Sequence, residues 1–150
     1  MSGPFIFIAT NRLKEGMLAA ERERVPGLVE FNEENEPRLL AFNEYANEEG
    51  TEVGVVQVHR DAESMELHMQ TVAERAARAY AETLEATTSI QVYGTPTEAV
   101  LQMLRRQAGA GVPLVVNAIT SEGSPGRRPA SDTGNTRASA SWPPGESRSS

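Results

Sequence analysis

Few residues of this chain have side chains suited to catalysis, and Asn11 is the first candidate. It ends the run Phe5 to Thr10, whose aromatic and β-branched residues are typical of a buried β-strand. Because successive strand residues point to opposite faces, Phe5, Phe7 and Ala9 share a face with Asn11. That face therefore ends in a neutral amide beside aromatic and small side chains. The alternative is that Asn11 is a turn residue whose amide binds nearby backbone groups.

Two histidines are the candidate acid–base residues. His59 closes a predicted strand, and His68 lies at the border of the apolar stripe on the next predicted helix. Histidine titrates near neutral pH, so His68 is suited to act as a general acid or base on a phenolic or carbon-acid substrate. The alternative is a histidine on the flank of a helix, bonded to water or backbone. The pair matches no metal-binding spacing and lacks a third ligand nearby, so we expect no metal.

Other reactive groups are scarce. The chain has no cysteine, which excludes disulfides, a thiolate nucleophile and cysteine metal ligands. No serine lies in a nucleophile elbow, and no glycine-rich loop has the spacing of a phosphate-binding motif. Buried tyrosines belong to the core more often than to a catalytic site. The remaining polar candidates are Asn43, Tyr45, Gln57, Gln91 and Tyr93.

Size and charge narrow the class of protein. The chain has 150 residues, about one domain, with enough length to bury a core. Its 14 basic and 21 acidic residues give a net charge of -7 without any basic stripe, so we expect no nucleic-acid partner. The apolar run near the start, Phe5 to Ala9, is too short for a signal peptide or a membrane span. We therefore expect a cytoplasmic protein that does not bind membranes.

The apolar patterns predict three helices and five strands. In the first helix, Pro26 is expected to cause a kink or to divide the helix near Val25. Before the third helix, Thr95 and Glu98 have the spacing of a capping box, with Pro96 as the first helical residue. The predicted helices span about residues 16–35, 61–84 and 96–108. After the first strand, the predicted strands span residues 38–47, 51–59, 87–93 and 112–119.

The order strand, helix, strand, strand, helix, strand over residues 4–94 predicts a ferredoxin-like α+β fold, an antiparallel sheet with two helices on one face. That leaves the other face of the sheet uncovered and too apolar for water. We therefore predict a homodimer in which two sheets face each other and enclose a cavity. The last strand is expected to extend a sheet edge of its own chain or of the partner. To the uncovered face we assign Phe5, Phe7, Asn11, Tyr45, Val55 and Tyr93.

The composition divides the chain into a folded domain, residues 1–119, and a tail, residues 120–150. Of the 31 tail residues, 16 are Ser, Pro or Gly, and none is Val, Ile, Leu or Phe. Such a segment buries too little apolar surface to offset its chain entropy, so we expect it to be disordered. The only tryptophan, Trp142, lies in this tail, which is either inert or a short binding motif.

Three features together resemble the antibiotic biosynthesis monooxygenase family of dimeric α/β barrels. They are the order of elements, the strand end Asn11-Arg12-Leu13, and the passage His59-Arg60-Asp61-Ala62-Glu63-Ser64-Met65 that leads to His68. The resemblance covers residues 4 to about 94. Members of this family include cofactor-independent oxygenases of quinols and anthrone-like polyketides, and also haem-degrading monooxygenases.

For this chain the resemblance implies a cofactor-independent monooxygenase that binds a phenolic, quinol or polyketide ring between sheet and helices. Such an electron-rich substrate supplies the electron for dioxygen activation itself, so no cofactor is expected. Asn11 matches the pocket asparagine that holds a substrate oxygen. His68 matches a histidine of the quinol-type members and would assist deprotonation. The residues implied to contact the ring are Phe7, Tyr45, His59 and Tyr93.

Two departures from the family pattern keep other functions open. Many members have a tryptophan where this chain has His59, which favours a non-catalytic dimer that binds a small molecule or a partner. In the haem-degrading branch the proximal histidine falls on Arg78, and arginine cannot ligate iron because it stays protonated, so haem degradation is not expected. An isomerase or decarboxylase with His68 as base is a third possibility, because fold alone does not set function. A pocket reached by both Asn11 and His68 would favour an enzyme, and a filled interior would favour a scaffold.

Overall fold

The computed structural model describes residues 3–119, and the predicted disordered tail, residues 120–150, lies outside that range. The first six elements have the predicted ferredoxin-like order, and a helix and a strand follow them. In chain order the elements are β1 (Phe5–Leu13), α1 (Leu18–Asn35), β2 (Leu39–Ala46), β3 (Glu52–His59), α2 (Ala62–Glu82), β4 (Leu84–Tyr93), α3 (Glu98–Ala108) and β5 (Leu114–Asn117).

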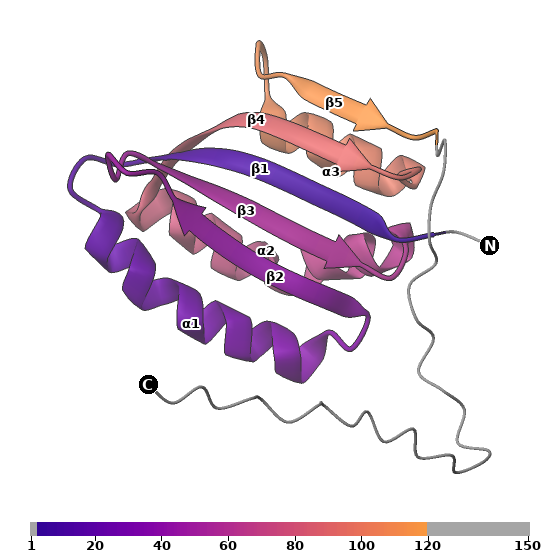
Figure 1. The fold of residues 1–150 in the computed structure, drawn as a ribbon, viewed down its shortest axis with the longest axis horizontal. Helices are drawn as coiled ribbons and strands as arrows, with labels where there is room; N and C mark the ends of the chain where they lie inside the picture. Colours follow the sequence, from indigo (N-terminus) through magenta and orange to yellow (C-terminus); the bar gives the residue numbers. More distant parts are fainter. Residues whose placement is uncertain (1–2, 120–150) are drawn as a thin grey trace, which may run out of the picture.

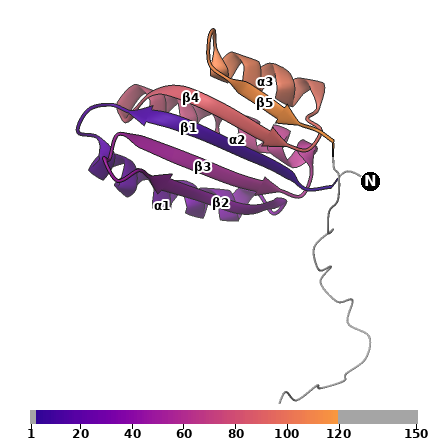
Figure 2. The ribbon, with the colours of Figure 1, turned by 45° about the horizontal axis from the view of Figure 1, so that its top comes forward.

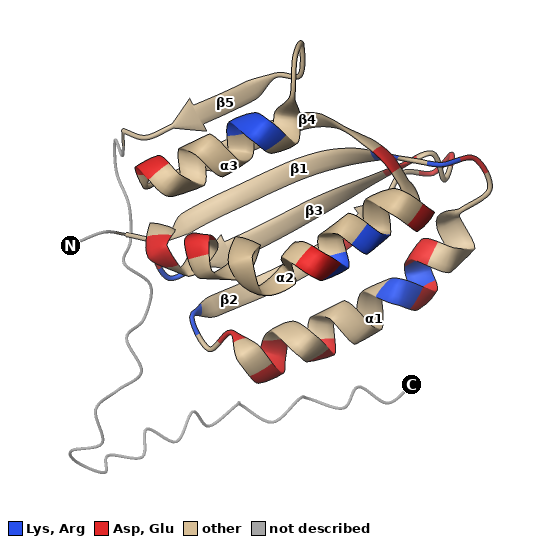
Figure 3. Cartoon of the chain, turned by 180° about the vertical axis from the view of Figure 1, so that it is seen from behind, with Lys and Arg blue, Asp and Glu red and all other residues tan. Residues whose placement is uncertain are grey.

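The strands form one sheet in the order β2-β3-β1-β4-β5 (Figure 1). The central strand β1 pairs antiparallel with β3 and β4, whereas β5 pairs parallel with β4. The last strand therefore extends the sheet edge of its own chain (Figure 2). The three helices lie on one face of the sheet and carry most of the charged residues seen from that side (Figure 3). Over residues 3–119, no element covers the opposite face, which we call the open face.

Strand register decides which side chains face the helices, and the predicted assignment is wrong for four residues. Tyr93 pairs with Ile6, one position out of phase with Phe7, so its side chain leaves from the open face. Tyr45 also lies on the open face, opposite Gly54 of β3. The four residues that instead lie buried beneath the helices are Phe5, Phe7, Asn11 and Val55.

Large apolar side chains account for this choice of face. Phe5 and Phe7 pack with Met65 of α2 and with Val100 and Leu104 of α3, and all five are almost completely buried. Burying aromatic and aliphatic side chains of this size stabilises the fold by about 1.5–3 kcal/mol each. The opposite face of β1 has no aromatic side chain, since it consists of Ile6, Ile8, Thr10 and Arg12. The face with the two phenylalanines is therefore the one that fills the core.

Side-chain caps fix where α2 and α3 begin. Asp61 accepts a hydrogen bond from the backbone N–H of Ser64 at 2.8 Å, which confirms the predicted start of α2. The cap of α3 is Thr97, whose hydroxyl accepts from the N–H of Val100 at 3.1 Å. The predicted cap at Thr95 is therefore wrong by two residues, because Thr97 is the residue with extended geometry directly before the helix.

Helix α1 runs as one helix past Pro26, so of the two predicted alternatives, a kink or a division into two helices, the division is wrong. Proline removes a single backbone donor here, and α1 is held on both sides of it by the buried residues Glu21 and Leu28. None of the helices within residues 3–119 is long and apolar enough to cross a lipid bilayer.

The turn after β4 requires a glycine, and substitution of Gly94 tests this, with Gly27 of α1 as the control. Gly94 has a φ of +116°, and a Cβ there would lie 3.1 Å from the carbonyl oxygen of Pro4. We expect Gly94→Ala to lower the free energy of unfolding by about 1–3 kcal/mol. Gly27 lies inside α1 with open space around it, so Gly27→Ala should raise that free energy by about 0.5–1 kcal/mol. Urea unfolding of both variants checks this, and equal losses of stability would contradict it.

Candidate functional site

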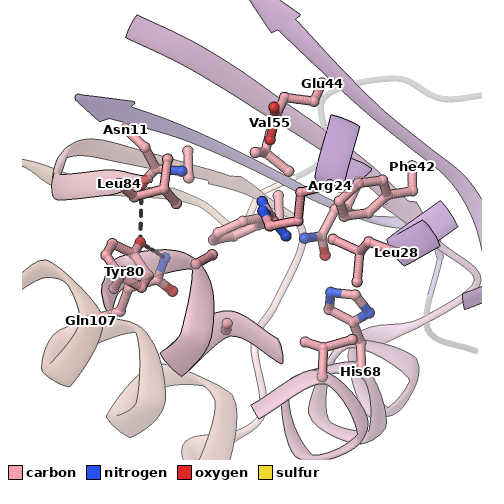
Figure 4. A pocket seen from close by; sticks show the side chains of 16 residues that line it. Asn11, Arg24, Leu28, Phe42, Glu44, Val55, His68, Tyr80, Leu84 and Gln107 are labelled. Carbon is pink, nitrogen blue, oxygen red and sulfur yellow. Dashed lines mark hydrogen bonds between the residues drawn. The ribbon is translucent and has the colours of Figure 1, made fainter. Parts of the chain in front are cut away.

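An apolar pocket of about 550 Å³ lies between the helix-facing side of the sheet and the helices (Figure 4). This volume includes space that is open to solvent. A neighbouring hollow shares Phe7, Gln57 and His68 and continues toward Met65 and Met69 of α2. The polar residues that line the pocket are Asn11, Arg24, Glu44, Gln57, His68, Tyr80 and Gln107.

At one side of the pocket, Asn11 is held by side chains from two other elements. Its Oδ1 accepts hydrogen bonds from the hydroxyls of Tyr80 in α2 at 3.0 Å and of Thr87 in β4 at 2.8 Å. Gln107 of α3 in turn donates to the Tyr80 hydroxyl at 3.4 Å (Figure 4). Asn11 is thus a buried strand residue, not a turn residue. Its NH₂ group has no partner within residues 3–119 and is available to a ligand oxygen.

At the other side, His68 of α2 is held by a carboxylate. Its Nδ1 lies 2.9 Å from both side-chain oxygens of Glu36, the residue that ends α1, and both side chains are almost completely buried. A carboxylate accepts only from an N–H, so it favours the form of His68 that is protonated at Nδ1. Nε2 has no hydrogen-bond partner in the described part of the chain. His68 is therefore bound to a side chain, not to backbone.

His59 lies behind the pocket and is not among the residues that line it. It is completely buried, with Nδ1 2.9 Å from the Ser64 hydroxyl and Nε2 2.9 Å from Oε1 of Gln57. Burial and, secondly, the nearby His68 lower the pKa of His59 to about 3, so its imidazole is neutral. His59 therefore positions Gln57, which does line the pocket.

A charged group on the wall near α1 was not predicted from the sequence. Arg24 forms two hydrogen bonds to the carboxylate of Glu21, which also accepts from the hydroxyl of Thr83. Burial acts to raise the pKa of Glu21, but the hydrogen bonds from Arg24 and Thr83 outweigh it and lower that pKa. Burial, and next the negative charge of Glu21, raise the pKa of Glu44 to about 8. Glu44 therefore presents a protonated carboxyl group to the pocket at neutral pH.

The structure brings together three of the six predicted site residues. Phe7, Asn11 and His68 line the same pocket. Tyr45 and Tyr93 lie on the open face, with 63% and 40% of their surface exposed, so they cannot contact a ligand in this pocket. The predicted cavity between two facing sheets is likewise not this one, because this pocket lies wholly on the helix side of a single chain. Within residues 3–119, no group of three or more His, Asp or Glu side chains is arranged to hold a metal ion.

The similarity of this chain to known proteins lies in its fold. No protein-family model matches the sequence, and no curated protein matches it. Among solved structures, MupZ from Pseudomonas fluorescens superimposes with a TM-score of 0.63 at 18% identity, over 85% of this chain and 99% of that chain. A "putative antibiotic biosynthesis monooxygenase" from Caulobacter crescentus gives 0.54 at 16% identity, over 61% and 88%.

The chain has the fold of the antibiotic biosynthesis monooxygenases. Rv0793 from Mycobacterium tuberculosis also superimposes on this chain, with a TM-score of 0.52 at 17% identity over 65% of this chain and 99% of that chain. Identities this low establish the backbone arrangement and assign no role to any side chain.

Glu44 makes stability depend on pH in a defined direction. The folded chain keeps the Glu44 proton up to about pH 8, whereas an unfolded chain loses it near the ordinary value of 4.5. Between these values the folded state binds more protons, so this residue's contribution to stability falls as the pH rises. We expect Glu44→Gln to gain stability over wild type progressively from pH 5 to pH 8.

Urea unfolding at pH 5, 6.5 and 8 measures this difference. The control is Glu48→Gln in the exposed loop between β2 and β3, for which the difference from wild type should not change with pH. A Glu44→Gln variant whose difference from wild type is the same at all three values would show that Glu44 is charged in the folded chain.

Proposed function

We propose that this chain is a cofactor-independent monooxygenase that acts on a phenolic, quinol or polyketide-type aromatic substrate. The observation that carries the proposal is a single apolar pocket lined by both Asn11 and His68. Asn11 presents an amide donor and His68 presents an unpaired ring nitrogen, so the pocket offers a hydrogen bond for a substrate oxygen and an acceptor for its proton. Phe7 on the pocket floor supplies an aromatic surface for the substrate ring.

The chemistry needs no external reductant when the substrate has a methylene group conjugated with a phenol. His68 takes the proton and leaves an electron-rich anion, which transfers an electron to dioxygen and then forms a carbon–oxygen bond. The methylene becomes a carbonyl, which keeps one oxygen atom, and the second oxygen leaves as water with the two hydrogens. The carbon loses four electrons in this reaction, which is the number needed to reduce both atoms of dioxygen.

Glu36 supports this role of His68. Its carboxylate fixes the ring orientation, keeps the proton on Nδ1 and leaves Nε2 toward the pocket. When Nε2 takes a proton, the negative charge of Glu36 compensates the imidazolium that forms, as a carboxylate does behind a catalytic histidine. Because the pair is buried, this compensation is stronger than it would be in water.

We further propose that the protein is a homodimer formed through the open face of the sheet. The apolar side chains of β1 and β3 on that face, among them Ile8 and Val56, are only partly buried in a single chain. Tyr45 and Tyr93 are exposed beside them. A contiguous apolar surface of this kind is rarely left in water. A second copy would cover it and leave the pocket on the helix side of each chain.

Removal of the Asn11 amide tests the catalytic proposal. We expect Asn11→Ala to fold and to reduce oxygen uptake with an anthrone-like or quinol substrate by about a hundredfold, the typical loss for one oxyanion-binding donor. Uptake is measured on metal-free protein with an oxygen electrode over a panel of such compounds. Asn35→Ala, which removes an exposed amide from the end of α1, is the matched control and should retain full activity. Unchanged oxygen uptake by Asn11→Ala would show that Asn11 has no catalytic role.

Absence of any oxygen uptake by the folded wild-type protein would overturn the monooxygenase proposal as a whole. The pocket would then belong to a ligand-binding module of the same fold, which is the alternative that the missing core tryptophan favours.

A charge on the open face tests the dimer. Val56→Glu places a carboxylate among the apolar side chains of β1 and β3, so we expect it to convert the dimer into a monomer. The control Leu67→Glu introduces the same change at an exposed position of α2, on the other side of the sheet, and should leave the dimer intact. Size-exclusion chromatography with light scattering gives the masses, and a wild-type monomer would refute the proposal.

A further inference from the structure

Gln57 repeats on β3 the arrangement that Asn11 has on β1. Both are primary amides on the helix-facing side of the sheet, with only 5% and 4% of their surface exposed, and both line the pocket. The oxygen of Gln57 is occupied by Nε2 of His59 at 2.9 Å. Its NH₂ group has no hydrogen-bond partner in the described part of the chain. The pocket is thus lined by two amides whose oxygens accept hydrogen bonds from other side chains and whose NH₂ groups have no partner in the described part of the chain.

The direction of the hydrogen bonds behind Gln57 is set by chemistry. A neutral imidazole has one N–H, and the oxygen of Gln57 can only accept, so Nε2 of His59 carries the hydrogen. Nδ1 of His59 then accepts from the hydroxyl of Ser64, whose backbone N–H is bound by the helix cap Asp61. These consecutive hydrogen bonds connect the start of α2 to the oxygen of Gln57. It leaves the Gln57 amide able only to donate toward the pocket.

The two amides lie far apart on the same face. Asn11 pairs with Val53, and Gln57 lies four residues further along β3, opposite Phe7. Four residues of a strand span about 13 Å, before the side chains shorten the gap. Between them the pocket wall is apolar, with Ala9 and Val55 paired across the two strands. A ligand that reaches both amides must therefore be longer than one aromatic ring.

We propose that Gln57 is a second oxygen-binding residue and that the pocket selects a fused-ring aromatic ligand with a hydrogen-bond acceptor, a carbonyl or phenolate oxygen, at each end. This inference rests on the pocket used in the proposed function and adds a second residue that binds the ligand and a minimum length for that ligand. It does not depend on catalysis. A buried N–H group without an acceptor costs free energy. The pocket therefore favours a ligand that places an accepting oxygen at each of the two amides.

Two naphthalene ketones test the proposal by equilibrium binding in the absence of oxygen. The probe 2,6-diacetylnaphthalene has an acceptor at each end, whereas 2-acetylnaphthalene has one. We expect wild-type protein to bind the diketone about tenfold or more tightly than the monoketone. In Gln57→Leu this preference should fall to near unity, with little change in binding of the monoketone. Gln70→Leu, at an exposed position of α2, is the control and should keep the wild-type preference.

A second variant and a direct signal guard against misfolding of Gln57→Leu. Gln57→Glu keeps an oxygen for His59 and removes the donor, so it should also lose the preference. In wild-type protein, the ¹⁵N side-chain amide signals of both Asn11 and Gln57 should shift when the diketone is added. No binding of either ketone, equal binding of the two, or a Gln57 amide signal that does not move would overturn the inference. Because no turnover is measured, a protein that binds with this preference but consumes no oxygen would refute only the monooxygenase proposal.

Discussion

The interior of this protein is governed by the requirement that polar groups removed from water find partners. Beneath the helices lie amides, imidazoles and carboxylates that would each cost free energy if left unpaired. Glu21 is completely buried and is bound by Arg24 and Thr83. His59 uses both ring nitrogens, and Glu36 holds His68. These bonds leave little freedom to the side chains around the pocket, so its wall is already ordered before a ligand arrives.

The helices that cover the pocket differ in the side chains that attach them to the sheet. α2 and α3 present apolar residues such as Met65 and Leu104 to the sheet. α1 buries only three residues, Glu21, Leu28 and Asn32, and two of these are polar. The amide of Asn32 is buried with neither its nitrogen nor its oxygen bonded in the described part of the chain. α1 therefore buries fewer apolar side chains than α2 and α3 do, and polar contacts at its two ends contribute more to its attachment.

The sequence predicted the order of elements well because helix and strand periods are local properties. It also placed Asn11 and His68 in a common pocket through a resemblance that the fold comparison supports. It failed on the face of the sheet, since alternation groups residues without saying which group faces the helices, and this put Phe7 and Val55 on the wrong face. It also missed Glu36, which meets His68 only through tertiary packing across 32 positions. The sequence also gives no sign that Glu21 is buried, because a charged residue on a helix is usually exposed.

The central position of β1 has a consequence for the way the chain reaches this structure. The first strand forms no pairs with its nearest neighbour in sequence: Phe7 pairs with Gln57 on one side and with Val92 on the other. The sheet cannot close until about ninety residues have been synthesised, and the cost of closing such long loops slows folding. Before β3 has been made, the apolar strand β1 has no strand to pair with, and its second partner, β4, follows about thirty residues later.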